Sequence, residues 1–184
     1  NNVKTNYLGT ITFSTDNSNA TLPSDYTFLQ GDAGIHTFTN GVQLKAVTDS
    51  CYVRVDGSNK TGQESNIAVT PGAIDHFTVT GIASSVTADD LLSPVVKAYD
   101  KYNNVKTNYL GTITFSTDNS NATLPSDYTF LQGDAGIHTF TDGVQLKAVT
   151  DSCYVRVADG QKQGQESNIA VTPGTLDHFT VTGI

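Results

Sequence analysis

The sequence predicts an all-β chain of tandem β-sandwiches, and three observations lead to this expectation. Ser, Thr and Gly are abundant while Met and Trp are absent, a composition typical of many short strands joined by turns. Apolar and polar residues alternate with the period of two that half-buried strands show. A long internal repeat carries this pattern twice, and no stretch shows a helical apolar stripe. Separate all-β domains are therefore favoured over a helical or mixed fold.

The internal repeat sets the domain organisation. Residues 1–82 and 103–184 align without a gap at an offset of 102 and differ at only eight positions. Five of these differences separate residues 56–61 from 158–163, where Gly, Asp and Asn predict a hairpin turn. This period matches one self-contained sandwich. We expect a repeat lacking its first strands at 1–72, a complete repeat at 73–174, and the first strand of a further repeat at 175–184.

The complete repeat is expected to hold about seven strands and to fold as an immunoglobulin-like sandwich. Alternation places the apolar residues of each strand on its inner face. The Asp142–Gly143 step inside the apolar run 140–148 is expected to be a β-bulge in a continuous strand. The predicted core consists of Phe77, Val79, Val96, Ile113, Phe115, Leu146, Val155, Val157, Ile169 and Val171.

Four segments of the repeat resemble a known family. Residues 98–104 read AYDKYNN and residues 109–116 read YLGTITFS. Residues 122–130 and 133–140 follow as ATLPSDYTF and GDAGIHTF. These runs resemble the bacterial and archaeal Ig-like (Big-type) tandem repeats, except that Asn103 stands where that family has Gly. The resemblance implies an extracellular spacer or display role in a large S-layer-like or adhesin protein at the cell surface.

Charge and motifs exclude several function classes. The formal net charge is −8 and the pI is near 4.6, whereas a nucleic-acid binder needs a basic face. No run approaches the roughly 18 apolar residues of a membrane span. Hydrolase, zinc-protease, phosphate-loop and Cys-x-x-Cys motifs are missing from the sequence. We expect no enzyme, no nucleic-acid partner and no membrane insertion in this segment.

Calcium is the alternative to the expectation that no cofactor binds. Ca²⁺ takes six to eight oxygen ligands, and acidic and amide side chains gather around the second predicted strand. Yet no EF-hand-type loop is present, and Asp and Asn also form turns in any β protein. The calcium candidates are Asp89, Asp90, Asp100, Asn103 and Asn104.

The remaining candidates are thiols, an imidazole and glycosylation sequons. Cys51 and Cys153 occupy equivalent places in the two copies, so we expect buried free thiols; a thiol linking neighbouring chains is the alternative. His138 is expected to brace the loop that precedes it rather than to bind metal. The N-x-[ST] sequons predict glycosylation candidates in turns. These are Asn19, Asn59 and Asn121.

Two functions follow, and the ends of the chain bear on both. The leading prediction is a stiff structural spacer in a stalk, sheath or filament; the alternative is an adhesive module whose turns contact a glycan or host protein. Without its first two strands, segment 1–72 should leave Ile11, Phe13, Val53 and Ile67 open to water. Residues 176–184 have the pattern of one missing strand. Either preceding residues of a longer chain fill the gap, or this strand adds to the next chain head to tail.

Overall fold

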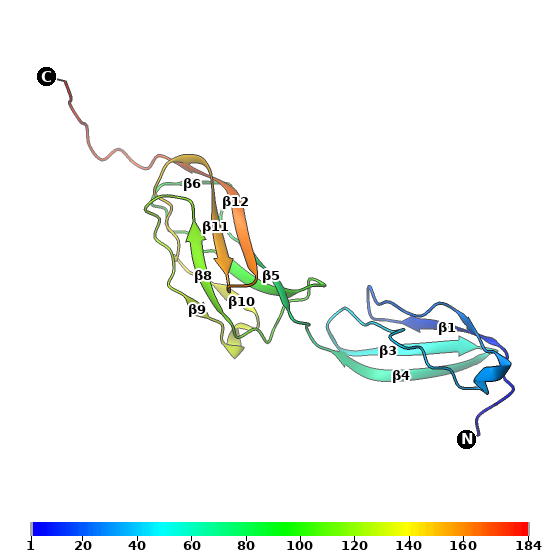
Figure 1. Cartoon of the computed structure of the whole chain (residues 1–184). Helices are drawn as coiled ribbons and strands as arrows, with labels where there is room; N and C mark the ends of the chain where they lie inside the picture. The colour runs from blue at the N-terminus through cyan, green and yellow to red at the C-terminus, as the bar shows by residue number, and fades with distance from the viewer. Residues whose placement is uncertain (1, 184) are drawn as a thin grey trace. The chain divides into compact units, whose positions relative to one another are not determined.

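The computed structural model describes residues 2–183 and confirms an all-β chain. Helix in these residues is limited to two short 3₁₀ turns, η1 (Gln30–Asp32) and η2 (Gln132–Asp134). No helix in the described part of the chain is long and apolar enough to cross a membrane. The chain divides into two compact units, Asn1–Thr70 (unit 1) and Pro71–Ile184 (unit 2), each of which is described by itself (Figure 1).

Unit 2 is a sandwich of two sheets. One sheet has the strand order β6-β12-β11-β8-β9 and the other has the order β10-β7-β5. Only the pairing of β6 with β12 is parallel among the pairs described. The strands are β5 (Ile74–Thr80), β6 (Ser85–Thr87), β7 (Val95–Asp100), β8 (Thr112–Thr117), β9 (Tyr128–Thr129), β10 (Ile137–Thr139), β11 (Thr150–Ala158) and β12 (Gln163–Thr172).

The core of unit 2 follows the predicted alternation. Every predicted core residue is buried except Phe115, which is partly buried and packs edge-on against Phe140 at a centroid distance of 4.7 Å. Phe130 also lies in the core with only 1% of its surface exposed. It follows directly after the two-residue strand β9, which is too short to show a period of two. The alternation therefore identifies core positions on long strands and misses this one.

The expected strand and β-bulge at 140–148 are wrong. The chain makes a tight turn here, because Asp142 has a left-handed φ of 51° and the Gly143 N–H donates to the Phe140 carbonyl at 3.1 Å. Single bridges from Val144 to Leu92 and from Gln145 to Thr123 replace a ladder. Val144 is nevertheless fully buried. Val144 is thus buried, as the alternation predicts, although no continuous strand runs through this segment.

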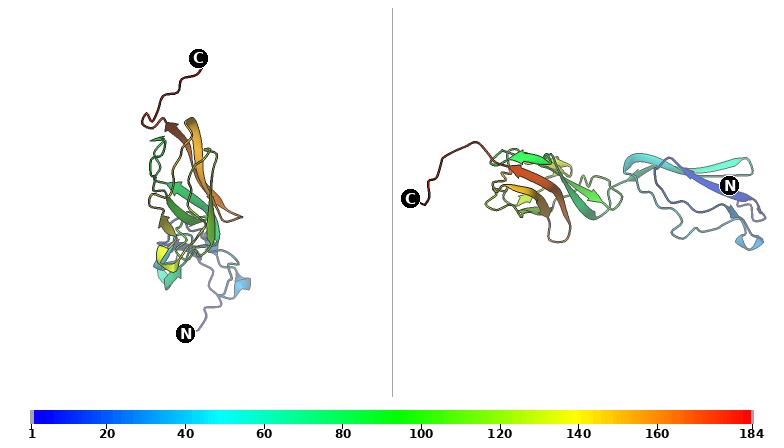
Figure 2. Two further views of the ribbon diagram at one scale, coloured as in Figure 1. Left: turned by 90° about the vertical axis from the view of Figure 1, so that its left-hand side faces the viewer. Right: turned by 90° about the horizontal axis from the view of Figure 1, so that it is seen from above.

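Unit 1 is one sheet rather than a sandwich (Figures 1 and 2). Its order β2-β1-β3-β4 matches β9-β8-β11-β12 of unit 2. Residues 35–37 form no strand, although the same sequence forms β10 in unit 2. Strand β10 pairs with β7, and unit 1 has no counterpart of β7. The strands are β1 (Thr10–Thr15), β2 (Tyr26–Thr27), β3 (Thr48–Gly57) and β4 (Lys60–Val69).

The inner face of the unit 1 sheet is partly open, as expected for Ile11, Phe13, Val53 and Ile67. All four are partly buried, whereas Ile113, Val155 and Ile169 of unit 2 are fully buried. The difference is larger for Val42, which is 40% exposed while its counterpart Val144 is 0% exposed. The two valines occupy equivalent positions in the repeat and lie beside equivalent strands. The absence of a second sheet in unit 1 therefore accounts for the exposure of Val42.

The segment after β12 differs from the expected strand. Residues 177–183 repeat the sequence of 75–81 but form no strand, and Figure 1 shows them as coil. Strand β5 exists because it pairs with β7 and packs against β12, and the tail has no such partner in the described chain. Phe179 and Val181 are 85% and 79% exposed. Ile184 lies outside the described residues.

Candidate functional site

An apolar groove of about 630 Å³ lies on the inner face of the unit 1 sheet. Its apolar lining consists of Tyr7, Ile11, Phe28 and Val55. The rings of Tyr7 and Phe28 meet edge to face at 5.3 Å. Near the β3–β4 turn the lining also includes Lys60 and Gly62. These six residues define the unit 1 groove, an apolar recess whose lining also includes a second cationic side chain, that of Lys4.

The equivalent place in unit 2 is filled by strand β5. Phe77 lies 5.3 Å from the ring of Tyr109, the counterpart of Tyr7. A Cβ on Gly164, the counterpart of Gly62, would lie 2.0 Å from the Phe77 carbonyl oxygen. Lys162, the counterpart of Lys60, pairs with Asp75 at 3.5 Å. The unit 1 groove is thus the seat that β5 occupies in unit 2.

The backbone over Gly62 is correspondingly open. A Cβ at Gly62 would meet only the Val55 side chain, at 3.3 Å. The two equivalent glycines therefore differ in their surroundings. Gly164 is covered by the backbone of β5 in unit 2, whereas the space over Gly62 is open in unit 1. The sequence predicted that residues on this face would be exposed, but it did not identify the role of the two glycines. A close approach of one backbone to another does not alter the alternation of apolar and polar residues, so the sequence pattern does not reveal it.

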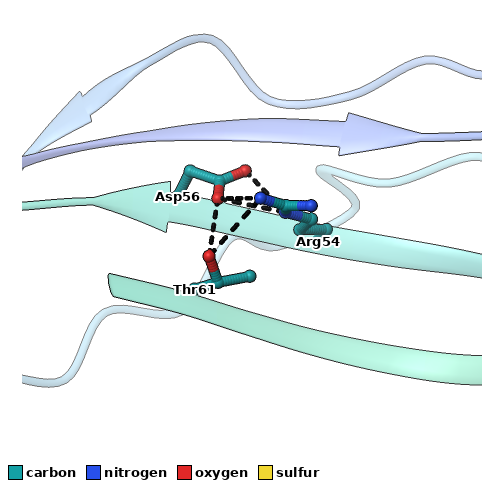
Figure 3. Close-up of polar contacts among 3 residues, drawn as sticks. All are labelled: Arg54, Asp56 and Thr61. Atoms are coloured by element: carbon teal, nitrogen blue, oxygen red, sulfur yellow. Dashed lines mark hydrogen bonds and ion pairs between the residues drawn. The ribbon is translucent and has the colours of Figure 1, made fainter. Parts of the chain in front are cut away.

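The β3–β4 turn, which differs most between the copies, carries a polar cluster in unit 1 (Figure 3). Its loop residues Ser58 and Asn59 both have left-handed φ, 49° and 57°, as a two-residue type I′ turn requires. Asp56 accepts hydrogen bonds from Arg54 at 2.6 Å and from Thr61 at 2.8 Å. The Arg54 bond, followed by the Thr61 bond, lowers the pKa of Asp56. This turn presents a neutralised ion pair.

The corresponding turn in unit 2 is built differently. Arg156 donates to Gln165 Oε1 at 2.9 and 2.8 Å, because Ala158 stands where unit 1 has an aspartate. Asp159 accepts a bond of 3.0 Å from the Tyr109 hydroxyl. Burial first, and then the bond to Asp159, raises the pKa of Tyr109. The two turns therefore share little chemistry that one ligand could recognise.

Three of the calcium candidates lie in a single turn, and the oxygens of its aspartate accept hydrogen bonds from groups of the same unit. Asp100 is 2% exposed and accepts bonds from the N–H groups of Gly72, Tyr102 and Asn104 at 2.9 to 3.0 Å. The Asn104 amide donates to it at 2.9 Å, and the Asn103 N–H donates to its carbonyl. Burial raises the pKa of Asp100, but the Asn104 and backbone bonds outweigh it and lower the pKa to about 2. This carboxylate anchors a turn.

Asp89 and Asp90 lie elsewhere and are exposed. Asp90 accepts from the Thr87 N–H at 3.0 Å, and Thr87 lies beside the end of β12. Asp100 lies beside the start of β5, which packs near the start of β12. The two groups therefore sit toward opposite ends of unit 2. Within residues 2–183, no three His, Cys, Asp or Glu side chains gather as metal ligands would.

His138 braces its loop through hydrogen bonding and stacking. Its Nδ1 lies 3.1 Å from Asp134, and its ring stacks on Tyr128 at 4.0 Å. Asp134 also accepts from the Tyr128 hydroxyl at 2.9 Å. Unit 1 repeats the arrangement with His36 stacked on Tyr26 at 3.9 Å. The closely similar geometry in both units marks a structural brace around the 3₁₀ turn.

The thiols and the sequons also have clear places. Cys51 and Cys153 are unbridged, and each has 4% of its surface exposed. Burial, with a smaller effect of the Asp118 charge, raises the pKa of the Cys153 thiol.

The glycosylation candidates are exposed, with left-handed φ of 57° to 59°, and their modification stays a prediction. They are Asn19, Asn59 and Asn121.

Comparison with known proteins identifies distant structural similarity only. No protein-family model matches the chain, and no curated protein does, so the Ig-like (Big-type) resemblance stays a prediction. A structure of surface layer protein SbsC, domains 4-9, matches with 17% identity and a TM-score of 0.40, over 95% of this chain and 23% of that one. InvD of Yersinia pseudotuberculosis matches with 20% identity and a TM-score of 0.46, over 96% and 50%.

A further structure, domains 4 and 5 of SbsC, matches with 17% identity and a TM-score of 0.38, over 95% of this chain and 74% of that one. The chain spans about a quarter of the SbsC domain 4-9 structure and half of InvD. Similarity at this level leaves function to be argued from the chain itself.

Proposed function

We propose that this chain is a structural repeat of an extracellular surface stalk, sheath or filament and acts as a stiff spacer. The observation that supports this most strongly is the 102-residue repeat, which builds the same strand order twice. The units are joined by only four residues, 70–73, between the end of β4 and the start of β5. A short connection between copies of one scaffold is what a stiff spacer requires.

The short connection is also restrained. Pro71 fixes its own φ, and the Gly72 N–H donates to the buried carboxylate of Asp100 at 2.9 Å. Two of the four connecting residues therefore have little freedom, unlike those of a flexible linker. Strands that rise about 3.3 Å per residue, with loops added, give an axial step of about 35–45 Å per repeat. Stacked repeats would form a rod.

Several carboxylates form hydrogen bonds within their own unit, which agrees with a spacer role. Asp100, Asp134 and Asp159 each accept several hydrogen bonds from their own unit. The most strongly held carboxylates are thus committed to turns rather than to a substrate. We infer that the chain carries no catalysis. The resemblance of its repeat to Ig-like tandem repeats of surface proteins supports an extracellular location.

Electron microscopy of longer arrays tests this proposal. Chains with three and with six successive copies of residues 73–174 should appear as straight rods whose end-to-end distance rises linearly by about 35–45 Å per copy. Strings that bend freely at every junction would contradict it, because their end-to-end distance would grow only as the square root of copy number.

An adhesive module that contacts a glycan or host protein through its turns is the second candidate. The exposed Arg54–Asp56 cluster favours it. Against it, the turns of the two units offer different polar groups. Binding of the chain to a glycan array, lost on substitution of Arg54 by Ala, would support this candidate over the spacer.

A further inference from the structure

We propose that Asn40 in unit 1 is a site of spontaneous deamidation, at which the fold itself places the two residues that the reaction needs. The proposal does not depend on the spacer role or on the open face of the unit 1 sheet. It rests on the turn at residues 38–41, which the complete unit 2 repeats at 140–143, and on how the other asparagines are held.

The turn has the same form in both units. Asn40 has a left-handed φ of 53°, and the Gly41 N–H donates to the Phe38 carbonyl at 3.0 Å. Asp142 takes the same place in unit 2, with φ of 51° and an equivalent hydrogen bond of 3.1 Å. Asn and Asp adopt this conformation more readily than other residues with a side chain. Asn40 and Asp142 are both exposed, so the exposure also holds in a unit that has both sheets.

Packing requires glycine at the next position. A Cβ on Gly41 would lie 2.9 Å from both the Cβ of Phe38 and the Cγ of Pro23. A Cβ on Gly143 would lie 3.0 Å from the Cβ of Phe140. Contacts this short force neighbouring atoms to move, so glycine alone fits without strain. The left-handed residue and the close packing together select an Asn–Gly or Asp–Gly step here.

The Asn–Gly step is the reactive one of the two. The backbone nitrogen of Gly41 attacks the side-chain carbonyl carbon of Asn40, and the new C–N bond closes a five-membered imide. The side-chain nitrogen leaves with the proton of the attacking nitrogen as ammonia. Water then adds to either imide carbonyl, which yields aspartate or isoaspartate. Glycine hinders the attack least because it has no side chain, and Asn40 is the only asparagine in the sequence that precedes glycine.

The asparagines that precede serine are held rigidly by the fold. Asn17 is 6% exposed, and its Oδ1 accepts from the N–H groups of Lys45 and Ala46. Its Nδ2 donates to the Ala46 carbonyl at 2.7 Å. Asn119 is held in the same way in unit 2. An amide that is bonded at both ends does not turn toward its own backbone, so these two residues are protected.

Unit 2 shows that the fold accepts the aspartate product. Asp142 stands at the equivalent position, and its turn keeps the geometry of the Asn40 turn. Its ionised carboxylate reacts far more slowly with a nucleophile than an amide does.

Isoaspartate instead adds a methylene to the main chain between residues 40 and 41. This changes the spacing to Gln43, which bridges to Thr21 through N···O distances of 2.8 and 2.9 Å. Unit 1 therefore keeps its stability in the aspartate form and loses part of it in the isoaspartate form. Either product adds one negative charge to a chain whose formal net charge is −8.

Incubation of the whole native chain at mildly alkaline pH, followed by peptide mapping with mass spectrometry, tests the proposal. Conversion should occur first at Asn40, with uptake of oxygen from isotopically heavy water, while Asn17 and Asn119 stay unmodified. Gly41 must first release the Phe38 carbonyl. The native chain should therefore convert about two- to tenfold more slowly than the same chain in urea, as the loss of one hydrogen bond predicts. Hydroxylamine, which opens the imide and cuts the main chain, should divide the native chain once, between residues 40 and 41.

Two variants serve as matched controls. Asn40→Gln has a longer side chain that does not close the five-membered ring, so it should remove the cut. Asp142→Asn carries the reactive step into unit 2, where both sheets are present, and should add a second cut between residues 142 and 143. Ser93 contacts that side chain at 3.3 Å, so the second cut should form more slowly than the first. Unchanged protection of the Cys153 thiol shows that this variant remains folded.

Three results would overturn the proposal. One is a native chain in which Asn40 stays intact while the chain in urea is fully converted, because the turn would then block the reaction. Another is conversion of Asn17, Asn119 or any other asparagine before Asn40 in the native chain. The last is an Asp142→Asn chain that remains folded and gives only the cut after residue 40.

Discussion

Alanine at the two equivalent glycines should affect the units very differently. In Gly164→Ala the new Cβ would lie 2.0 Å from the Phe77 carbonyl oxygen and 2.4 Å from its carbon. Strand β5 must then move away from β12. Overpacking costs about 1–3 kcal/mol, and we expect the upper value because the clashing atoms belong to the backbone. In Gly62→Ala the Cβ meets only the Val55 side chain, at 3.3 Å.

The intrinsic gain of about 0.5–1 kcal/mol from replacing a strand glycine by alanine applies to both sites and cancels in the comparison. Unit 2 of Gly164→Ala should therefore lose about 3 kcal/mol relative to unit 1 of Gly62→Ala. Pulsed thiol labelling in urea measures each unit separately, since each contains one buried cysteine. Cys51→Ser and Cys153→Ser backgrounds assign the signal. Equal losses within about 0.5 kcal/mol would refute the close approach of β5 to Gly164.

Three further outcomes are expected. In the unaltered monomer, Cys51 should label faster than Cys153 at every urea concentration, because the unit 1 core is partly open; equal rates would contradict this. Since the pKa of Asp100 is lowered to about 2, its contribution of about 2 kcal/mol to unit 2 should persist above pH 4 and disappear as the pH falls through 2. Asp100→Asn should remove this part of the acid dependence in pH-dependent unfolding; an unchanged profile would refute the assignment. Tyr109→Phe should destabilise unit 2 by about 1–2 kcal/mol in urea unfolding, because its buried hydroxyl donates to a carboxylate, whereas Tyr7→Phe, whose partner is exposed, should cost under about 0.5 kcal/mol. Similar losses in the two variants would speak against that bond.

Sequence pattern predicted the long strands because burial on one face imposes a period of two. It identified Val155, Val157 and Ile169 as core residues for this reason. It failed at 140–148, where the same parity is reached through a turn with a left-handed Asp142. Local pattern does not distinguish a strand held by a ladder from a bent segment held by single bridges.

The groove shows a second limit of sequence reasoning. Residues 75–81 and 177–183 are identical, yet one segment lies in a strand and the other is coil. Pairing with β7 and packing on β12 decide the difference, and neither is local. The open face of unit 1 followed from counting missing strands. The role of Gly62 and the bond from Tyr109 to Asp159 required contacts between residues distant in sequence.

The most direct test of whether the unit 1 groove is the seat of a β5-type strand is to supply that strand covalently. A copy of residues 73–102 placed ahead of Asn1 restores the order found in the complete repeat. Thiol labelling of Cys51 in this extended chain, in a Cys153→Ser background, should slow to the rate that Cys153 shows in unit 2. Labelling of Cys51 at an unchanged rate would contradict the claim, because the added strands would then have left the unit 1 core as open as before.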